Sequence, residues 1–321
     1  MAGGQERVLR RRIKSVQSTK KITRAMELIA ATRVVKAQQR AAAARPYSED
    51  MTAVIQHLAQ AGGAVEHPLL RPADQPKKVA FVVITSDRGL AGAYNALVIR
   101  AAEREIMARR AEGVDYSLVL IGKKGQTYFK FRGYRIDAAF TGISDTPTYE
   151  NAREVAEAVV EPFEHGDIDE VFLVYTRFLS VGSQRVVVRR FMPLQGVGTE
   201  DVSDELSADY EFEPSPGEIL YELLPRYVEA RLFAALLDAA ASEHASRQRA
   251  MKAATDNAEE LITKLSRVMN RARQDAITTE IMEIVGGAEA LKGAGADAGD
   301  LLPDHLGSQD YFTDTLSTRS A

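Results

Sequence analysis

The chain has 321 residues, of which 45% are hydrophobic and 27% are charged, as is ordinary for globular domains. It contains no cysteine, which excludes disulfides and thiolate chemistry, and no run of about 20 apolar residues that could span a bilayer. Twelve Lys or Arg and one acid lie between Arg7 and Arg45. The whole chain has a formal net charge of −4 and this stretch has a charge of +11, so the remaining residues together have a charge of −15.

The first predicted element is a helix over residues 1–60. No Gly or Pro lies between Gln5 and Arg45, and apolar residues recur at three- to six-residue steps, at Val8, Ile13, Val16, Ile22, Met26 and Ile29. This spacing predicts an amphipathic helix. Pro46 removes one helix hydrogen bond, so we expect a kink or break there.

A basic helix can contact nucleic acid, a membrane surface or an acidic protein. Phosphate binding needs only clustered Lys and Arg, but no aromatic residue lies between Met1 and Arg45 to stack on bases. Helix-turn-helix and zinc-finger patterns are also absent from the sequence. The sequence therefore favours a protein partner over nucleic acid.

A central α/β domain is predicted over residues 77–200. Apolar runs predict strands at 79–84, 116–125, 170–178 and 184–193. One helix is predicted after the first strand and its turn, ending near residue 110, and another over 147–162. Strands that alternate with helices are typical of a largely parallel sheet with helices on both faces.

The turn SDRGLAGAYN follows the first of these strands and precedes a helix, where phosphate-binding loops occur. It matches neither GxGxxG nor GxxxxGK[ST]. The five histidines are scattered, without carboxylates at metal-ligand spacing, and no nucleophile elbow or HExxH pair is present. We therefore predict no cofactor, no metal and no catalytic residue.

A second long helix is predicted over residues 216–287, after an acidic turn-like stretch. The sixty residues from Arg226 to Val285 lack Gly and Pro, and apolar residues recur largely at three- and four-residue steps. That pattern indicates packing along another helix. We expect Pro225 to interrupt this helix, and we expect residues 288–321, which are rich in Gly, Ala and Asp, to form a flexible extension.

The predicted fold class is therefore α/β, with a long antiparallel two-helix coiled coil and a central Rossmann-like domain. The second helix would be about 90 Å long, which exceeds the width of a compact domain of this size. The two terminal helices are therefore expected to extend beyond the domain together, as the coiled coil. On these patterns alone, a structural coiled-coil protein that acts as a homodimer is the plainest interpretation.

Several segments resemble the gamma subunits of F-type ATP synthases. RRIKSVQSTKKITRAMELIAATRVVKAQ is similar to their amino-terminal helix, and ASEHASRQRAMKAATDNAEELI and NRARQDAITTEIMEIVGGAEAL to their carboxy-terminal helix. SDRGLAGAYN resembles their Asp-Arg-Gly-Leu-Cys-Gly turn, with Ala91 in place of Cys. The resemblance covers about residues 1–290; its departures are Ala91, Pro225 and about thirty residues after Gly287.

This resemblance implies a rotor subunit that is not catalytic alone. Its expected role is to couple proton-driven rotation of the membrane c-ring to ATP synthesis or hydrolysis in the alpha-beta ring. The implied partners are the alpha, beta and epsilon subunits and the c-ring, with the membrane contacted only through the c-ring. The implied location is peripheral, at the cytoplasmic face of a bacterial plasma membrane.

The resemblance and the charge pattern also predict contact residues. Those expected to face the alpha-beta ring are Met26, Arg247, Gln274, Thr278, Arg10, Arg11 and Arg12. Those expected to face the c-ring are Tyr210 and Glu213. The plainer alternatives are helix packing for Met26, solvated helix surface for the polar residues of the second helix, and an ordinary acidic loop for the c-ring pair.

Overall fold

The computed structural model describes residues 2–62, 67–73, 75–194, 213 and 215–297. The chain divides into two compact units, one made of residues 1–18 and 259–321 and the other of residues 19–258. The helices α1 (Ala2–Gly62) and α5 (Pro216–Asp297) contribute to both units. Each unit is described by itself.

The unit of residues 19–258 contains a five-stranded sheet in the order β3-β2-β1-β4-β5. Four strands pair in parallel and the last pairs antiparallel with its neighbour. The strands are β1 (Lys78–Ile84), β2 (Asp115–Ile121), β3 (Ala138–Phe140), β4 (Glu170–Phe178) and β5 (Gln184–Met192). The predicted, largely parallel sheet is confirmed.

Shorter helices connect the strands: α2 (Tyr94–Ala111), α3 (Lys123–Phe131) and α4 (Tyr149–Glu164). The 3-10 turn η1 (Pro68–Leu70) lies between α1 and β1. The strand expected over 116–125 is corrected, because β2 ends at Ile121 and α3 occupies the residues from Lys123 onward. Gly122 ends β2 instead, with φ of +89°. A Cβ at this position would lie 2.3 Å from the Thr85 carbonyl oxygen, so only glycine fits this approach of β2 to β1.

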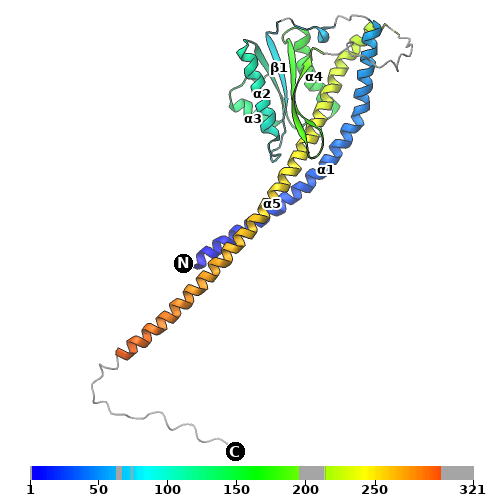
Figure 1. Cartoon of the computed structure of the whole chain (residues 1–321). Helices are drawn as coiled ribbons and strands as arrows, with labels where there is room; N and C mark the ends of the chain where they lie inside the picture. The colour runs from blue at the N-terminus through cyan, green and yellow to red at the C-terminus, as the bar shows by residue number, and fades with distance from the viewer. Residues whose placement is uncertain (1, 63–66, 74, 195–212, 214, 298–321) are drawn as a thin grey trace, which may run out of the picture. The chain divides into compact units, whose positions relative to one another are not determined.

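Helices cover both faces of the sheet (Figure 1), and a hydrophobic core lies between each face and its helices. Successive side chains of β1 divide between them, because side chains alternate across a strand. Val82 belongs to the core formed with α4, α5 and the end of α1, where Ile55 and Leu58 are buried. Phe81 belongs to the core formed with α2 and α3. The sheet is therefore packed directly onto both long helices.

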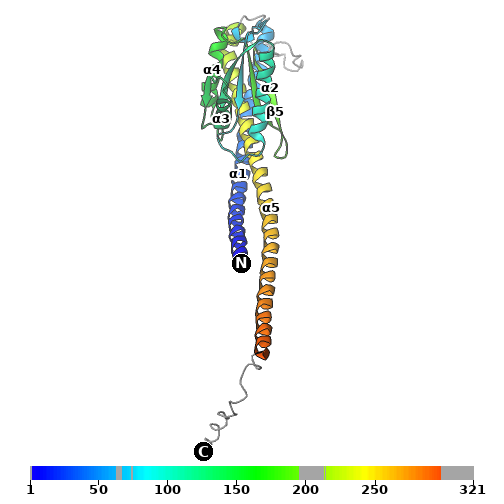
Figure 2. The ribbon, with the colours of Figure 1, turned by 90° about the vertical axis from the view of Figure 1, so that its left-hand side faces the viewer.

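Within residues 19–258, α1 and α5 run side by side in opposite directions (Figure 2). Their buried faces are rich in small residues, among them Ala30, Ala37, Ala240, Ala245 and Ala258. The hydroxyls of Thr23 and Thr255 share a hydrogen bond of 2.8 Å between the two helices. The predicted antiparallel helix pair is confirmed in this unit.

The expected breaks at Pro46 and Pro225, and the expected end of the second long helix at residue 287, are corrected. Neither Pro46 nor Pro225 ends its helix, since α1 continues to Gly62 and α5 begins at Pro216. Apolar packing on the sheet through Leu58, Leu220 and Leu224 offsets the one hydrogen bond that each proline removes.

The helix α5 also continues ten residues past the expected end at 287, to Asp297. The sequence AEALK that follows Gly287 consists of strong helix formers, which outweigh the isolated glycines. The expected flexible extension over 288–321 is therefore wrong for residues 288–297, and the rest of it lies outside the described residues.

The unit of residues 1–18 and 259–321 consists, where described, of the first turns of α1 and the last turns of α5. Its α5 segment exposes large apolar side chains with 49–77% of their surface open: Ile277, Ile281, Met282, Ile284, Val285 and Leu291. Contiguous apolar surface of this kind marks an interaction site in a protein that folds as a monomer.

Candidate functional site

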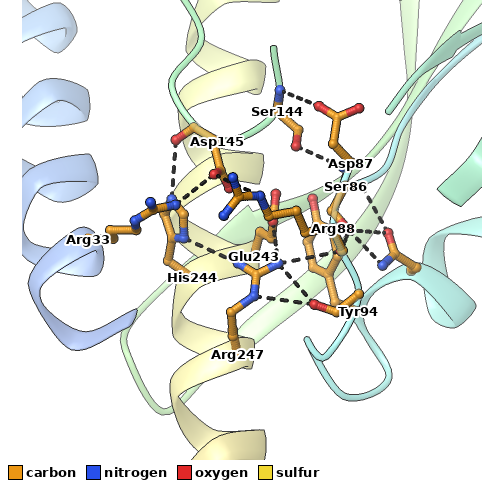
Figure 3. Close-up of polar contacts among 12 residues, drawn as sticks. Arg33, Ser86, Asp87, Arg88, Tyr94, Ser144, Asp145, Glu243, His244 and Arg247 are labelled. Atoms are coloured by element: carbon orange, nitrogen blue, oxygen red, sulfur yellow. Dashed lines mark hydrogen bonds and ion pairs between the residues drawn. The ribbon is translucent and has the colours of Figure 1, made fainter. Parts of the chain in front are cut away.

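A polar cluster connects α1, α5 and two loops at the carboxyl edge of the sheet, with its α5 members buried, Arg33 half-buried and Arg88 exposed (Figure 3). We call it the loop–helix cluster. The loops follow β1 (residues 85–93) and β3 (residues 141–148). The cluster comprises Arg33 of α1, Arg88 and Asp145 of the loops, and Glu243, His244 and Arg247 of α5.

Asp145 connects both long helices to the loop after β3. Its Oδ2 accepts a hydrogen bond of 2.6 Å from Arg33 Nη1 and lies 3.7 Å from Arg88 Nε. Its backbone oxygen accepts from His244 Nε2 at 3.2 Å. One residue of a loop is thus held by α1 and α5 together.

His244 is neutral and has a defined tautomer in this arrangement. Because Nε2 donates to the Asp145 carbonyl, Nδ1 carries the lone pair that accepts from Arg247 Nη1 at 3.4 Å. Burial lowers the pKa of His244, which further favours the neutral ring.

Arg247 and Glu243 form a buried ion pair on successive turns of α5, with Nη2 and Oε1 2.6 Å apart. The side chain of Arg247 is 9% exposed and that of Glu243 is 1% exposed. Arg247 Nη2 also donates to the backbone oxygen of Gly89 at 3.3 Å, which attaches the loop after β1 to α5. Burial raises the pKa of Glu243, and the positive charge of Arg247 opposes that rise.

Asp87 fixes the same loop to its neighbours through backbone amides. Its carboxylate accepts from the amides of Lys123 at 3.1 Å, Gly142 at 2.9 Å and Ser144 at 3.2 Å. Burial alone would raise the pKa of Asp87, but these donors and the Ser144 hydroxyl outweigh burial and lower it. Lys123 begins α3, so the carboxylate also lies at a helix N-terminus.

The start of α2 is attached to α5 by Tyr94. This buried side chain donates its hydroxyl hydrogen bond to the Ala239 carbonyl at 3.2 Å. Burial raises the pKa of Tyr94 well above its ordinary value, so the phenol stays protonated and can donate. Ser86 and Asn95 bond each other at 2.7 Å across the same turn.

The arrangement suits mechanical connection more than chemistry. The buried hydrogen bonds of Arg247 to Glu243 and His244 favour one geometry, because any displacement leaves charges unpaired in a low dielectric. Among the described residues, no group of three or more His, Cys, Asp or Glu could hold a metal ion. The cluster therefore fixes the sheet to both long helices at one level.

The structure places the residues that were predicted as contacts in different settings. Arg10, Arg11 and Arg12 are exposed on α1, and Gln274 and Thr278 are exposed on α5. Met26 is half-buried on α1 and Glu213 is exposed, whereas Tyr210 lies outside the described residues. Arg10 pairs locally with Glu6, at 2.6 Å.

The expectation that Arg247 faces outward is corrected. Only 7% of the residue is exposed, and its guanidinium bonds Glu243, His244 and the loop carbonyls of its own chain. It lies on the buried face because the spacing of Leu236, Ala240, Glu243 and Arg247 alternates four, three and four residues, as on the seam of paired helices.

Comparison with known proteins decides the family. A family model described as ATP synthase matches residues 5–291. The ATP synthase gamma chain of Frankia casuarinae is 51% identical over 90% of this chain and 98% of its own length. The chain belongs to the ATP synthase gamma-chain family. The gamma chain of Streptomyces coelicolor is 47% identical over 92% of this chain and 98% of its own length.

Solved structures agree on the fold. A chain of the Euglena gracilis mitochondrial ATP synthase covers 96% of this chain with a TM-score of 0.64 and 17% identity, and 99% of that chain is matched. A central-stalk chain of the Tetrahymena thermophila mitochondrial ATP synthase matches with a TM-score of 0.54 and 22% sequence identity. The match covers 73% of this chain and 99% of that chain. The family supports the rotor interpretation and gives no support to a homodimer. Within the described residues, no helix is long and apolar enough to cross a membrane.

One prediction concerns Asp238, a half-buried residue of α5. Burial raises its pKa to about 6, against the opposing charges of Arg177 and Arg45. When the pKa of a carboxyl is raised in the folded state, the protein loses stability as pH rises through that pKa. The reason is that the folded state binds the proton more tightly than the unfolded state does. Asp238→Asn should therefore stabilise the chain by about 1–2 kcal/mol at pH 8 and by much less at pH 4.

Urea unfolding at both pH values measures this difference. Asp256→Asn, which changes an exposed carboxylate of the same helix, is the control. An equal effect of Asp238→Asn at both pH values would contradict the raised pKa.

Proposed function

We propose that this chain is the central rotor of an F-type ATP synthase, coupling c-ring rotation to ATP synthesis or hydrolysis in an alpha-beta ring. The observation that carries the proposal is membership of the gamma-chain family across residues 5–291. The chain itself is not the catalyst in this proposal; its partners are the alpha, beta and epsilon subunits and the c-ring. Its place is peripheral to the cytoplasmic face of a bacterial plasma membrane.

The loop–helix cluster supports a rotor role physically. Torque must pass between the α/β domain and the paired helices without slippage. Arg33 and His244 connect both helices to Asp145, and Arg247 connects α5 to the loop after β1. A rotor with one fixed asymmetric shape can bias the populations of surrounding subunits in turn.

The exposed surfaces support contacts with a surrounding ring. The uncovered apolar side chains near the end of α5, such as Ile281 and Met282, suit an apolar sleeve. Gln274 and Thr278, exposed on the same helix, are proposed to hydrogen-bond ring loops, and Met26 to pack near an acidic beta segment. Glu213 is proposed, with Tyr210, to contact the polar loops of the c-ring.

Partner capture from native membranes tests the proposal. An affinity tag on this chain should recover alpha, beta, epsilon and c subunits in one complex that hydrolyses ATP. The isolated chain should show no hydrolysis under the same conditions. Recovery of a homodimer without those subunits would contradict the rotor proposal and return the chain to the structural coiled-coil class.

The basic start of α1 gives a salt-dependent prediction. Replacing Arg10, Arg11 and Arg12 together with Gln should weaken binding to the alpha-beta ring by more at low salt than at high salt. Exposed ion pairs are screened once the Debye length falls to about 3 Å, near 1 M salt. Binding of the purified chain to the ring at two ionic strengths is the measurement.

A matched triple variant of exposed arginines elsewhere, Arg100, Arg104 and Arg153 to Gln, controls for net charge. Equal weakening at both ionic strengths would show that the three α1 arginines act through packing. Equal effects of the two triple variants would show that net charge, and not position, matters.

A further inference from the structure

The turn after β1 contains a strained residue with an exposed apolar side chain. Leu90 has φ of +63° and is the sole residue other than glycine with a positive φ in the part of the chain that the structure describes. A leucine in this left-handed region costs free energy, because its Cβ crowds the backbone. Since 62% of Leu90 is exposed, burial of its own side chain does not explain the conformation.

Arg247 holds the peptide unit that precedes Leu90. Its Nε and Nη2 donate to the Gly89 carbonyl oxygen at 3.4 and 3.3 Å, and Nη2 also donates to the Arg88 carbonyl oxygen at 3.5 Å. The Gly89 carbonyl belongs to the planar peptide unit that ends at the nitrogen of Leu90, so its orientation constrains φ of Leu90. The fork of a guanidinium can hold both carbonyls at once, whereas a lysine ammonium is a single point of charge.

Further hydrogen bonds fix the turn on both sides of Leu90. Before it, the Ser86 hydroxyl donates to the Arg88 carbonyl oxygen at 2.5 Å. After it, the Tyr94 amide donates to the Ala91 carbonyl oxygen at 3.2 Å. Strain that the surrounding structure maintains in this way is concentrated at functional positions. The exposed leucine is held in one conformation before any partner arrives, which lowers the entropy cost of binding.

The turn lies beside the stretch of α5 that passes the carboxyl edge of the sheet. At this edge the Ser242 hydroxyl donates to the Thr176 carbonyl oxygen, near the end of β4. The helix then continues in sequence to Gln274 and Thr278, which are proposed above to contact the alpha-beta ring. The alpha-beta ring is therefore the partner that fits this edge of the domain.

We propose that Leu90 is an apolar contact with the alpha-beta ring and that Arg247 is the positioning residue that keeps it in the left-handed conformation. The complementary surface of the ring is apolar, and it meets the leucine side chain while Arg247 stays buried. The inference rests on the proposed rotor function. It adds the residue that the turn contributes to the contact and the group that orients this residue.

The affinity of the purified full chain for the purified alpha-beta ring tests the contact. Leu90→Asn keeps a residue type that adopts the left-handed region readily but removes the apolar side chain. It should weaken binding at least about tenfold without lowering the melting temperature. Leu90→Gly, which relieves the strain, should weaken binding at least as much. Met107→Gln, at an exposed apolar residue of α2 outside the turn, should leave the affinity unchanged.

Arg247→Lys separates positioning from folding. Lysine keeps a positive charge near Glu243 but cannot hold the two carbonyls as a fork. This substitution should weaken ring binding at least about threefold in the wild-type background and should cause no further loss in the Leu90→Asn background. Its effect on the melting temperature should be the same in both backgrounds, because the contact with Glu243 does not involve Leu90.

Two results would overturn the inference and leave the rotor proposal intact. One is an unchanged affinity of Leu90→Asn for the ring. The other is an equal loss of affinity from Arg247→Lys in both backgrounds, which would show that Arg247 acts without Leu90. If the wild-type chain does not bind the ring at all, the rotor proposal and the inference both fail.

Discussion

Arg247→Ala is expected to lower the free energy of unfolding by about 3–5 kcal/mol, the usual cost of removing one member of a buried ion pair. The substitution leaves the carboxylate of Glu243 buried without its cation and frees the carbonyl of Gly89. Alanine is a better helix former than arginine, so loss of helix propensity cannot explain the effect. Urea unfolding of the full chain measures it.

A second substitution separates the buried charge from lost packing. Glu243→Gln in the Arg247→Ala background removes the unpaired charge, so the double variant should be more stable than Arg247→Ala alone. A double variant that is less stable by the sum of the two single effects would show that the residues act independently.

The pH dependence has a defined sign. The pKa of Glu243 is already raised by burial, and loss of Arg247 removes the charge that opposes this rise. A carboxyl with a raised folded-state pKa stabilises the fold at low pH and loses that contribution as pH rises. The loss in free energy of unfolding caused by Arg247→Ala should therefore be smaller at pH 5 than at pH 8.

This result bears directly on the rotor proposal. If the loop–helix cluster transmits torque, Arg247→Ala should lower both the yield of assembled complex and its proton-coupled turnover. If Arg247 contacted a ring loop instead, assembly would be normal and only turnover would fall. The burial of its side chain, 9% exposed, favours the first outcome.

The long helices and most of the sheet were predictable because their signals are local. The steps of three and four residues along α5 and the continuous apolar run of β1 each lie within one window of sequence. The strand β3 was missed because it has three residues, and α3 was missed because Gly122 was not recognised as the end of β2.

The candidate site was less predictable because its contacts connect distant segments. Arg33 and Asp145 are 112 positions apart, and His244 and Asp145 are 99 apart. One local signal was available: Glu243 and Arg247 continue the apolar seam of α5 at helical spacing. Charged residues on a seam are buried, so this spacing could have indicated an internal pair instead of an outward contact.

Asp87→Ala is expected to lower the free energy of unfolding by about 2–4 kcal/mol, because three amide donors lose one shared carboxylate acceptor. Those donors belong to Lys123 at the start of α3 and to Gly142 and Ser144 in the loop after β3. The loss should loosen the start of α3 and the loop after β3 relative to β1. Amide hydrogen exchange at Gly142 and Ser144 should therefore accelerate in the variant.

The sign of the pH effect is opposite to that for Glu243. The pKa of Asp87 is lowered from 3.8 in the folded state, so its contribution is present above that value and is lost as pH falls through the folded-state pKa. The loss in free energy of unfolding caused by Asp87→Ala should be constant between pH 5 and pH 8 and should become smaller below about pH 4.

Formate can replace the missing carboxylate if the three amides keep their positions. The site lies at the N-terminus of α3 and at the carboxyl edge of parallel strands, where α/β proteins bind anions. Sodium formate should therefore stabilise Asp87→Ala more than sodium chloride of equal ionic strength does. Val82→Ala, which destabilises the buried core without opening an anion site, should respond equally to both salts. The same response of Asp87→Ala to formate and chloride would show that the loops collapse when the carboxylate is removed, and that Asp87 fills no preformed anion site.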